Sequence, residues 1–122
     1  MLRKFTVPVT VDASGNATAY TPHLSGFIAT IQYVKDDFAD GVDFTITAED
    51  TNEPIWVESN VNAAAIKHPQ AASHTTAGVA ALYAAGGTAV GVPIALSRDR
   101  VKIVVASGGN ATSGTFVITV SD

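Results

Sequence analysis

The sequence contains no cysteine. Disulfide frameworks, thiolate zinc sites and cysteine nucleophiles are therefore excluded, because each of them needs a sulfur atom that this chain does not have. The stability of the folded chain has to come from side-chain packing and from backbone pairing.

Charged side chains are also scarce. Asp, Glu, Lys and Arg make up 15% of the residues, against about 25% in an average soluble domain. The net charge is −4 and the longest basic run is the pair Arg3-Lys4, so no nucleic acid is expected as a partner. So little charge is typical of a surface that a partner or further copies of the chain cover, although many exposed Thr, Ser and Asn would have the same effect.

Long apolar runs are absent as well. No stretch approaches the ~20 apolar residues that span a membrane, so no membrane association is expected. Residues 1–8 begin with basic side chains, but no apolar stretch follows them, which is unlike a secretory signal. We therefore expect a protein that is made and kept soluble in a cytoplasm, unless another system carries it out.

The sequence does contain repeated alternation of apolar and polar residues. Its 122 residues, 47% of them hydrophobic, suffice for one core and are too few for two, so residues 1–122 are predicted to form a single domain. The clearest alternation predicts that Val42, Phe44, Ile46 and Ala48 point inward from a strand over residues 42–49. Further strands are predicted at residues 5–11, 17–20, 27–35, 54–59, 92–96, 100–106 and 115–120.

Turn-forming residues separate these segments, and no strand alternates with a long helix. The pattern predicts an all-β fold, an antiparallel β-sandwich or barrel with a jelly-roll-like arrangement. Pro8 cannot donate a backbone hydrogen bond, which places strand 5–11 at a sheet edge or Pro8 at a gap in the pairing. Residues 12–16 are rich in turn formers and predict a hairpin that joins strands 5–11 and 17–20.

Residues 60–92 show no clear period. Within them, the Ala-rich segment 77–85 contains Leu82 and Tyr83 and ends before Gly86-Gly87, a pattern compatible with a helix of about two turns. The same small residues would equally suit a crowded contact between sheets. We therefore expect at most one short helix in the chain, around residues 77–85.

Metal ligands do not form a recognised pattern. An acidic turn carries several Asp residues, but Phe38 and Thr47 stand where the helix–loop–helix calcium pattern needs an oxygen ligand and a Glu. His68 and His74 are too far apart in an irregular segment for a typical zinc site, so no metal or cofactor is predicted. For the acidic turn we expect a solvated loop, with a weak cation site as the alternative, at Asp36, Asp37, Asp40 and Asp43.

Catalytic motifs are not found either. The sequence has no Gly-x-Ser-x-Gly elbow, and Gly108-Gly109-Asn110 lacks the Gly-Lys-Ser/Thr and the helix of a phosphate-binding loop. We therefore predict that the chain is not an enzyme. One group of carboxylates is expected to be a solvated rim, with a carbohydrate- or receptor-binding module or a small hydrolase as the alternative; its members are Glu49, Asp50, Glu53 and Glu58.

Aromatic side chains divide into a core group and an interface group. Those at strand spacing are expected in the core, with Phe27, Ala29, Ile31 and Tyr33 on one face of their strand. Phe5, Tyr20 and Tyr83 fit the alternation less well and suit an interface, where aromatic anchors are favoured. The edge of strand 5–11 offers unpaired backbone groups to a neighbour's strand. The expected core aromatics are Tyr33, Phe44, Trp56 and Phe116, and the predicted partner interface consists of Phe5, Val7, Val9, Tyr20 and Tyr83.

Several stretches carry a family resemblance. Residues 98–116 contain a basic strand that leads into a Gly-Gly-Asn turn and then into a Gly-Thr-Phe strand. Residues 12–18, 31–34 and 69–75 are also similar to this pattern. Together these stretches span nearly the whole chain and resemble a family of small structural proteins that tailed bacteriophages and prophages encode.

This resemblance implies a component of a virion. The implied role is a capsid decoration, or cement, protein on the capsid exterior, assembled in the host cytoplasm, which bridges major capsid protein subunits as a homo-oligomer. The alternatives are a head–tail or tail-associated structural protein and, from a different class, the receptor- or carbohydrate-binding module.

Overall fold

The computed structural model describes residues 1–122 and contains strands and turns but no helix, which confirms the all-β prediction. None of its elements is an apolar helix of membrane-spanning length. The strands are β1 (Leu2–Thr10), β2 (Ala17–Tyr20), β3 (Leu24–Lys35), β4 (Val42–Ala48), β5 (Pro54–Val61), β6 (Ala65–Lys67), β7 (Gln70–Ala72), β8 (Gly91–Pro93), β9 (Ala95–Asp99), β10 (Val101–Ala106) and β11 (Ser113–Ser121).

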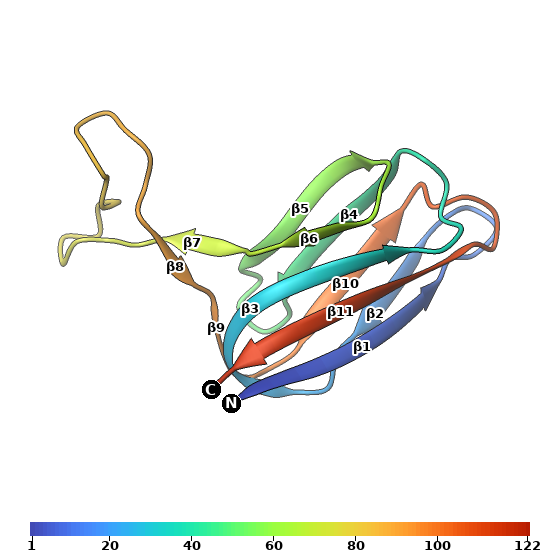
Figure 1. The fold of residues 1–122 in the computed structure, drawn as a ribbon, viewed down its shortest axis with the longest axis horizontal. Helices are drawn as coiled ribbons and strands as arrows, with labels where there is room; N and C mark the ends of the chain where they lie inside the picture. Colours follow the sequence, from blue (N-terminus) through green and yellow to red (C-terminus); the bar gives the residue numbers. More distant parts are fainter.

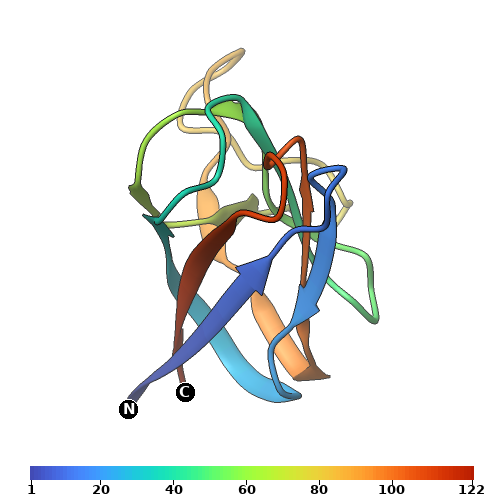
Figure 2. The same ribbon diagram turned by 90° about the vertical axis from the view of Figure 1, so that its right-hand side faces the viewer.

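Two antiparallel sheets form a sandwich with a jelly-roll strand order (Figures 1 and 2). One sheet has the order β1-β11-β3-β6, with β9 also paired to β3, and the other has the order β2-β10-β4-β5. The pairing is nested, because β1 pairs with β11, β2 pairs with β10, and β4 pairs with its neighbour β5. This winding is that of the double-sheet jelly roll, so the predicted arrangement is confirmed.

The sixth strand of the jelly roll is split in two. β6 pairs with residues 31–33 of β3, and β9 pairs with residues 24–27 of the same strand. Both run antiparallel to β3, so they continue one another along its edge. The chain between them forms a separate two-stranded sheet, β7-β8, which extends away from the sandwich (Figure 1).

The core lies between the two sheets and is centred on aromatic rings. The ring of Tyr33 packs edge-on against Phe44 at 4.8 Å and stacks on Phe116 at 5.5 Å between centroids. Phe44 also meets Trp56 edge-on at 5.3 Å. The four expected core aromatics are buried, and so are the inward residues predicted for β4: Val42, Phe44, Ile46 and Ala48.

The predicted alternation in β3 is wrong at its beginning. Phe27 is exposed, whereas Ile28 and Ile31 are buried. The pairing with β11 shifts register here, because Ile28 and Thr30 face consecutive residues of β11 and Ala29 has no partner. A β-bulge of this kind adds one residue and exchanges the two faces of the strand.

The predicted hairpin between the first two strands is also wrong. The turn itself forms, since the Asp12 carboxylate accepts hydrogen bonds from the backbone N–H of Ser14 and Asn16. However, β1 pairs with β11 and β2 pairs with β10, so the turn crosses from one sheet to the other. Gly15 has φ +84° and lies so close to Gly108 that a Cβ atom would come within 2.8 Å of the Gly108 nitrogen.

The short helix that the sequence pattern permitted at residues 77–85 does not form. Turns occur at Gly78 and, just after the segment, at Gly86, with φ of +77° and +69°. The backbone N–H of Ala81 donates to the carbonyl oxygen of Ser73, which precedes the segment, at 2.9 Å. The segment is not a crowded sheet contact either, because its side chains are largely exposed. A helix of two turns is marginal in water without a surface to pack on, and the sandwich offers none at this distance.

Candidate protein-binding surface

We call residues 68–93, which include β7 and β8, the arm. The arm contains no Asp, Glu, Lys or Arg, so every formally charged side chain of the protein lies outside it. Ala, Gly, Val and Thr make up most of the arm. An uncharged projection of this length is unusual in a protein surface, where charged side chains are normally the most exposed.

None of the arm residues is buried. Its large apolar side chains are open to solvent, with Val79 exposed to 62%, Leu82 to 43% and Tyr83 to 75%. Ordering the backbone costs roughly 1–2 kcal/mol per residue, and here burial within the chain offsets little of that cost. An exposed apolar surface on a projecting element is typical of a protein interaction site.

The arm nevertheless has a defined backbone. Ser73 donates to Val90 O from its backbone nitrogen at 2.8 Å and from its hydroxyl at 2.9 Å. Further along, Tyr83 N donates to Thr88 O at 3.0 Å and Val90 N donates to Ala81 O at 2.8 Å. A two-stranded sheet of this kind is only marginally stable alone, so additional contacts with a partner would be expected to stabilise it.

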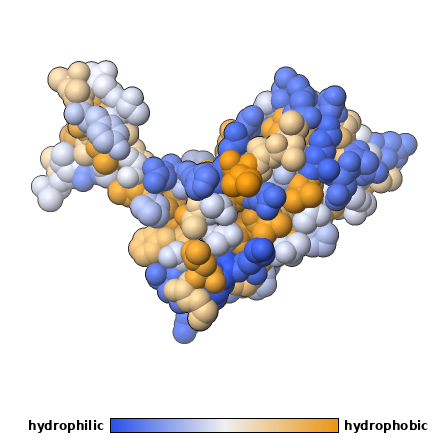
Figure 3. Space-filling model, in the orientation of Figure 1, coloured by the Kyte–Doolittle hydropathy of each residue, from blue (hydrophilic) through white to orange (hydrophobic).

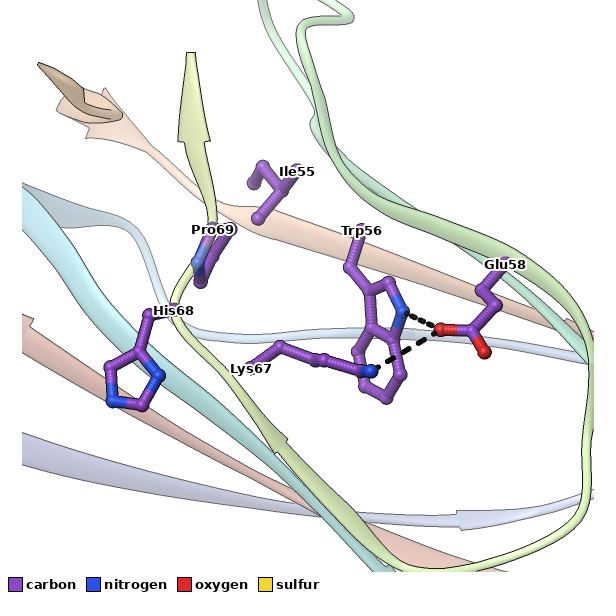
Figure 4. Close-up of a pocket in the computed structure, with 6 residues that line it drawn as sticks. All are labelled: Ile55, Trp56, Glu58, Lys67, His68 and Pro69. Atoms are coloured by element: carbon purple, nitrogen blue, oxygen red, sulfur yellow. Dashed lines mark hydrogen bonds and ion pairs between the residues drawn. The ribbon is translucent and has the colours of Figure 1, made fainter. Parts of the chain in front are cut away.

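A cavity lies at the base of the arm, beside the sandwich. It has a volume of about 250 Å³ and is open to solvent. The surface is visibly hollowed between the arm and the sandwich (Figure 3). We call this cavity the arm-base hollow; its lining residues are Ile55, Trp56, Glu58, Lys67, His68 and Pro69 (Figure 4).

The polar side chains of the hollow are paired with one another. Trp56 Nε1 donates to Glu58 Oε1 at 2.9 Å, and Lys67 Nζ lies 3.7 Å from the same oxygen (Figure 4). Lys67 Nζ also lies 5.8 Å from the centroid of the Trp56 ring. The opposite charges neutralise each other, so the hollow carries no net charge, and its apolar lining residues Ile55 and Trp56 are largely buried.

A second, smaller cavity lies next to the first. Its volume is about 160 Å³, and it shares His68 and Pro69 with the hollow while Ile28, Ala29 and Pro93 line its other side. Both cavities fall below the roughly 300–1,000 Å³ of typical small-molecule sites. Their size suits single side chains of a protein partner better than a metabolite.

The structure separates the five predicted interface residues. Tyr83 lies in the arm and is highly exposed. Tyr20 is half-exposed, with the Arg100 guanidinium 3.9 Å from its ring centroid, and Phe5 is partly buried against the core. Val7 and Val9 are buried at 7% and 3% exposure. Both side chains pack between the sheets, so a contact at these positions would use the edge backbone of β1, and their part in a partner interface stays a prediction.

The backbone of β1 does lie at a sheet edge, as Pro8 indicated. β1 pairs with β11 on one side and ends the strand order on the other. Pro8 removes one donor from this strand, which weakens it as a template for a further strand. The edge is therefore a poorer docking surface than the arm.

The acidic turn does not gather its carboxylates. Asp37 accepts a hydrogen bond from Ser113 N at 2.6 Å, and Asp43 accepts one from Asn60 N at 3.0 Å. Asp40 forms an ion pair with Lys35. No group of three His, Asp or Glu side chains comes together anywhere in the chain, and His68 and His74 lie on different parts of the arm.

The carboxylates around residues 49–58 are also apart. Glu49 accepts two hydrogen bonds from Arg100, at 2.8 and 2.9 Å. These bonds lower the pKa of the Glu49 carboxyl below its usual value and raise that of Arg100. Glu58 instead belongs to the hollow with Trp56 and Lys67. Glu49 and Glu58 therefore engage different partners.

Comparison with models of known protein families finds no match, and no curated protein is similar in sequence. The arm and the hollow therefore rest on the structure of this chain alone. The sequence did hold a signal for the arm, namely the long absence of charge that begins at His68. The hollow has no such signal, because its residues come from β5, from the end of β6 and from the start of the arm, which only the fold brings together.

Proposed function

We propose that this protein is a structural component of a bacteriophage virion, and that it decorates and stabilises the capsid from outside. The observation that carries the proposal is the arm, an uncharged projection without a single buried residue. Such an element suits a protein that works by being packed against other proteins.

Two further observations support the proposal. The jelly-roll strand order is one that viral capsid domains use, although the same fold carries other functions and does not define one by itself. The resemblance of residues 98–116 to small phage structural proteins points in the same direction. In this role the arm would contact either the major capsid protein or a neighbouring copy of the chain, and many weak contacts would add up across the shell.

The number of copies in purified particles tests the proposal. A decoration protein should be present in numbers comparable to the major capsid protein, as measured by quantitative mass spectrometry. A small fixed number of copies would instead place the protein at the neck or tail, and absence from particles would reject a virion role. Particles that lack the protein should also lose DNA at a lower temperature than complete particles.

A further inference from the structure

The arm and the arm-base hollow leave two complementary surfaces uncovered on one chain. The arm extends away from the sandwich (Figure 1), and beyond Pro69 none of its residues lines the hollow at its own base. The exposed side chains near its end are Val79, Leu82 and Tyr83. Ile55, Trp56 and Pro69 line the hollow, where Trp56 is 7% exposed and Ile55 8%.

We propose that the arm of one copy of this chain docks in the arm-base hollow of a second copy. This inference deepens the proposed structural role, on which it rests, by naming the surface and the partner for self-association. Each chain then supplies one arm and one hollow, so the exchange can be reciprocal and close as a symmetric oligomer.

The sizes of the two surfaces agree. The hollow, at about 250 Å³, has room for one large side chain, and Tyr83 and Leu82 are the large side chains that the arm exposes. An aromatic ring that enters such a hollow would pack against Trp56, and pairs of aromatic rings are worth about 0.5–1.5 kcal/mol beyond the area they bury. The Tyr83 hydroxyl could remain at the polar rim beside Glu58 and Lys67.

Charge favours a second copy as the occupant. Each chain carries a net charge of −4, so two copies repel one another at most of their surface. The arm has no charge, and the Glu58–Lys67 pair leaves the hollow without net charge. These are therefore surfaces on which two copies can meet without bringing like charges together, since like-charge contacts oppose association.

Sedimentation and light scattering of the purified full chain provide the first test. We expect the wild-type chain to form a dimer or a small closed oligomer, and Leu82→Asp/Tyr83→Asp to have the mass of one chain with an unchanged melting temperature. Leu2→Asp is the matched control, because Leu2 is exposed to 65% on the edge strand β1 and its substitution should leave the oligomer intact. A monomeric wild-type chain, or an oligomer that only Leu2→Asp disrupts, would overturn the inference.

Because the chain has no cysteine, crosslinking provides a second test. A mixture of Tyr83→Cys and His68→Cys chains should form a mixed disulfide on mild oxidation, since Tyr83 lies on the exposed part of the arm and His68, at its base, lines the hollow. Ser14→Cys replaces His68→Cys in the control mixture, because Ser14 lies in an exposed turn remote from the arm. Mixed disulfide no more abundant than in the control contradicts the docking.

The two proposals fail in different ways. A wild-type chain that stays monomeric yet is present in virions in high copy number would overturn arm exchange and leave the decoration role standing. An oligomer that depends on the arm but is absent from virions would do the reverse.

Discussion

At the scale of single residues, Tyr33 combines full burial with an unpartnered hydroxyl. Its side chain is 0% exposed, and the hydroxyl has no hydrogen-bond partner. Burial, together with the nearby charges of Asp36 and Asp40, raises the pKa of Tyr33 to about 12. A buried polar group without a partner costs about 1–3 kcal/mol. The ring of Tyr33 therefore stabilises the core by packing, whereas its hydroxyl adds no hydrogen bond to the fold.

We predict that Tyr33 makes the protein lose stability at alkaline pH. The unfolded chain releases this proton near the ordinary pKa of 10.0, and the folded chain releases it only near 12. Between these values the unfolded state binds fewer protons, so the free energy of unfolding falls as pH rises, by at most about 1.4 kcal/mol per pH unit. Urea denaturation across this range measures the slope.

Tyr33→Phe is the test variant for this prediction. It should match or slightly exceed the wild-type stability at neutral pH and should decline less steeply above pH 10. Tyr83→Phe serves as the control, because Tyr83 is exposed and its hydroxyl meets solvent in both states. Equal alkaline slopes for the wild type and Tyr33→Phe would show that Tyr33 is not the responsible group.

Gly114 shows how tightly the core is packed where β11 begins. A Cβ atom at this position would lie 2.5 Å from Cε2 of the buried Phe38 ring. We predict that Gly114→Ala destabilises the protein by roughly 1–3 kcal/mol, the usual cost of overpacking a filled core. Urea denaturation measures the loss. In a Phe38→Leu background, which removes the ring, Gly114→Ala should cost clearly less; an equal cost would point to the backbone instead.

At the scale of elements, the arm is an insertion into one strand of the jelly roll. β6 and β9 are held by β3 on either side of it, and no arm residue is buried in the sandwich. The sandwich should therefore fold without most of the arm. If the arm binds a partner as proposed, folding and partner binding depend on different parts of the same chain.

We predict that replacing residues 74–89 by Asn-Gly preserves the sandwich. The dipeptide suits a tight turn between paired strands, and a shorter loop lowers the entropy cost of closing it. The free energy of unfolding should stay within about 1 kcal/mol of the wild type, because none of the removed residues is buried and the shorter loop costs less entropy to close. Self-association should be lost. Circular dichroism with sedimentation measures both, and an unfolded variant would show that the arm is needed for folding.

At the scale of the whole molecule, charge and contact surface are separated. The net charge of −4 comes from side chains outside the arm, so the sandwich repels other copies while the arm does not. Salt screens this repulsion over a Debye length of about 8 Å at physiological ionic strength. The apolar contact between arm and hollow is not weakened by screening.

We predict that self-association persists or strengthens as sodium chloride is raised. The repulsion between sandwiches is screened, and burial of Leu82 and Tyr83 is unaffected. Sedimentation at low and high salt measures the change in dissociation constant. Dissociation at high salt would contradict the prediction, because it would indicate an interface held by ion pairs rather than by the arm.

The sequence by itself determined the local features of this protein. The alternation of Val42, Phe44 and Ile46 predicted a strand and its inner face, which is confirmed. Pro8 predicted either an edge strand or a gap in the pairing, and the strand lies at the edge. These features depend on neighbours in the chain, through side-chain period and backbone donors. The virion role and the lack of catalysis stay predictions, because they concern partners and reactions beyond the fold.

Only the tertiary structure decided how the strands are combined. The turn at residues 12–16 makes the same internal hydrogen bonds whether the next strand joins the same sheet or the opposite one, and pairing with the distant β10 and β11 settles which. The bulge at Ala29, the split sixth strand and the arm depend on pairing with β11 and β3 in the same way. Such contacts join residues far apart in the chain, and no local pattern encodes which of many compatible strands will meet.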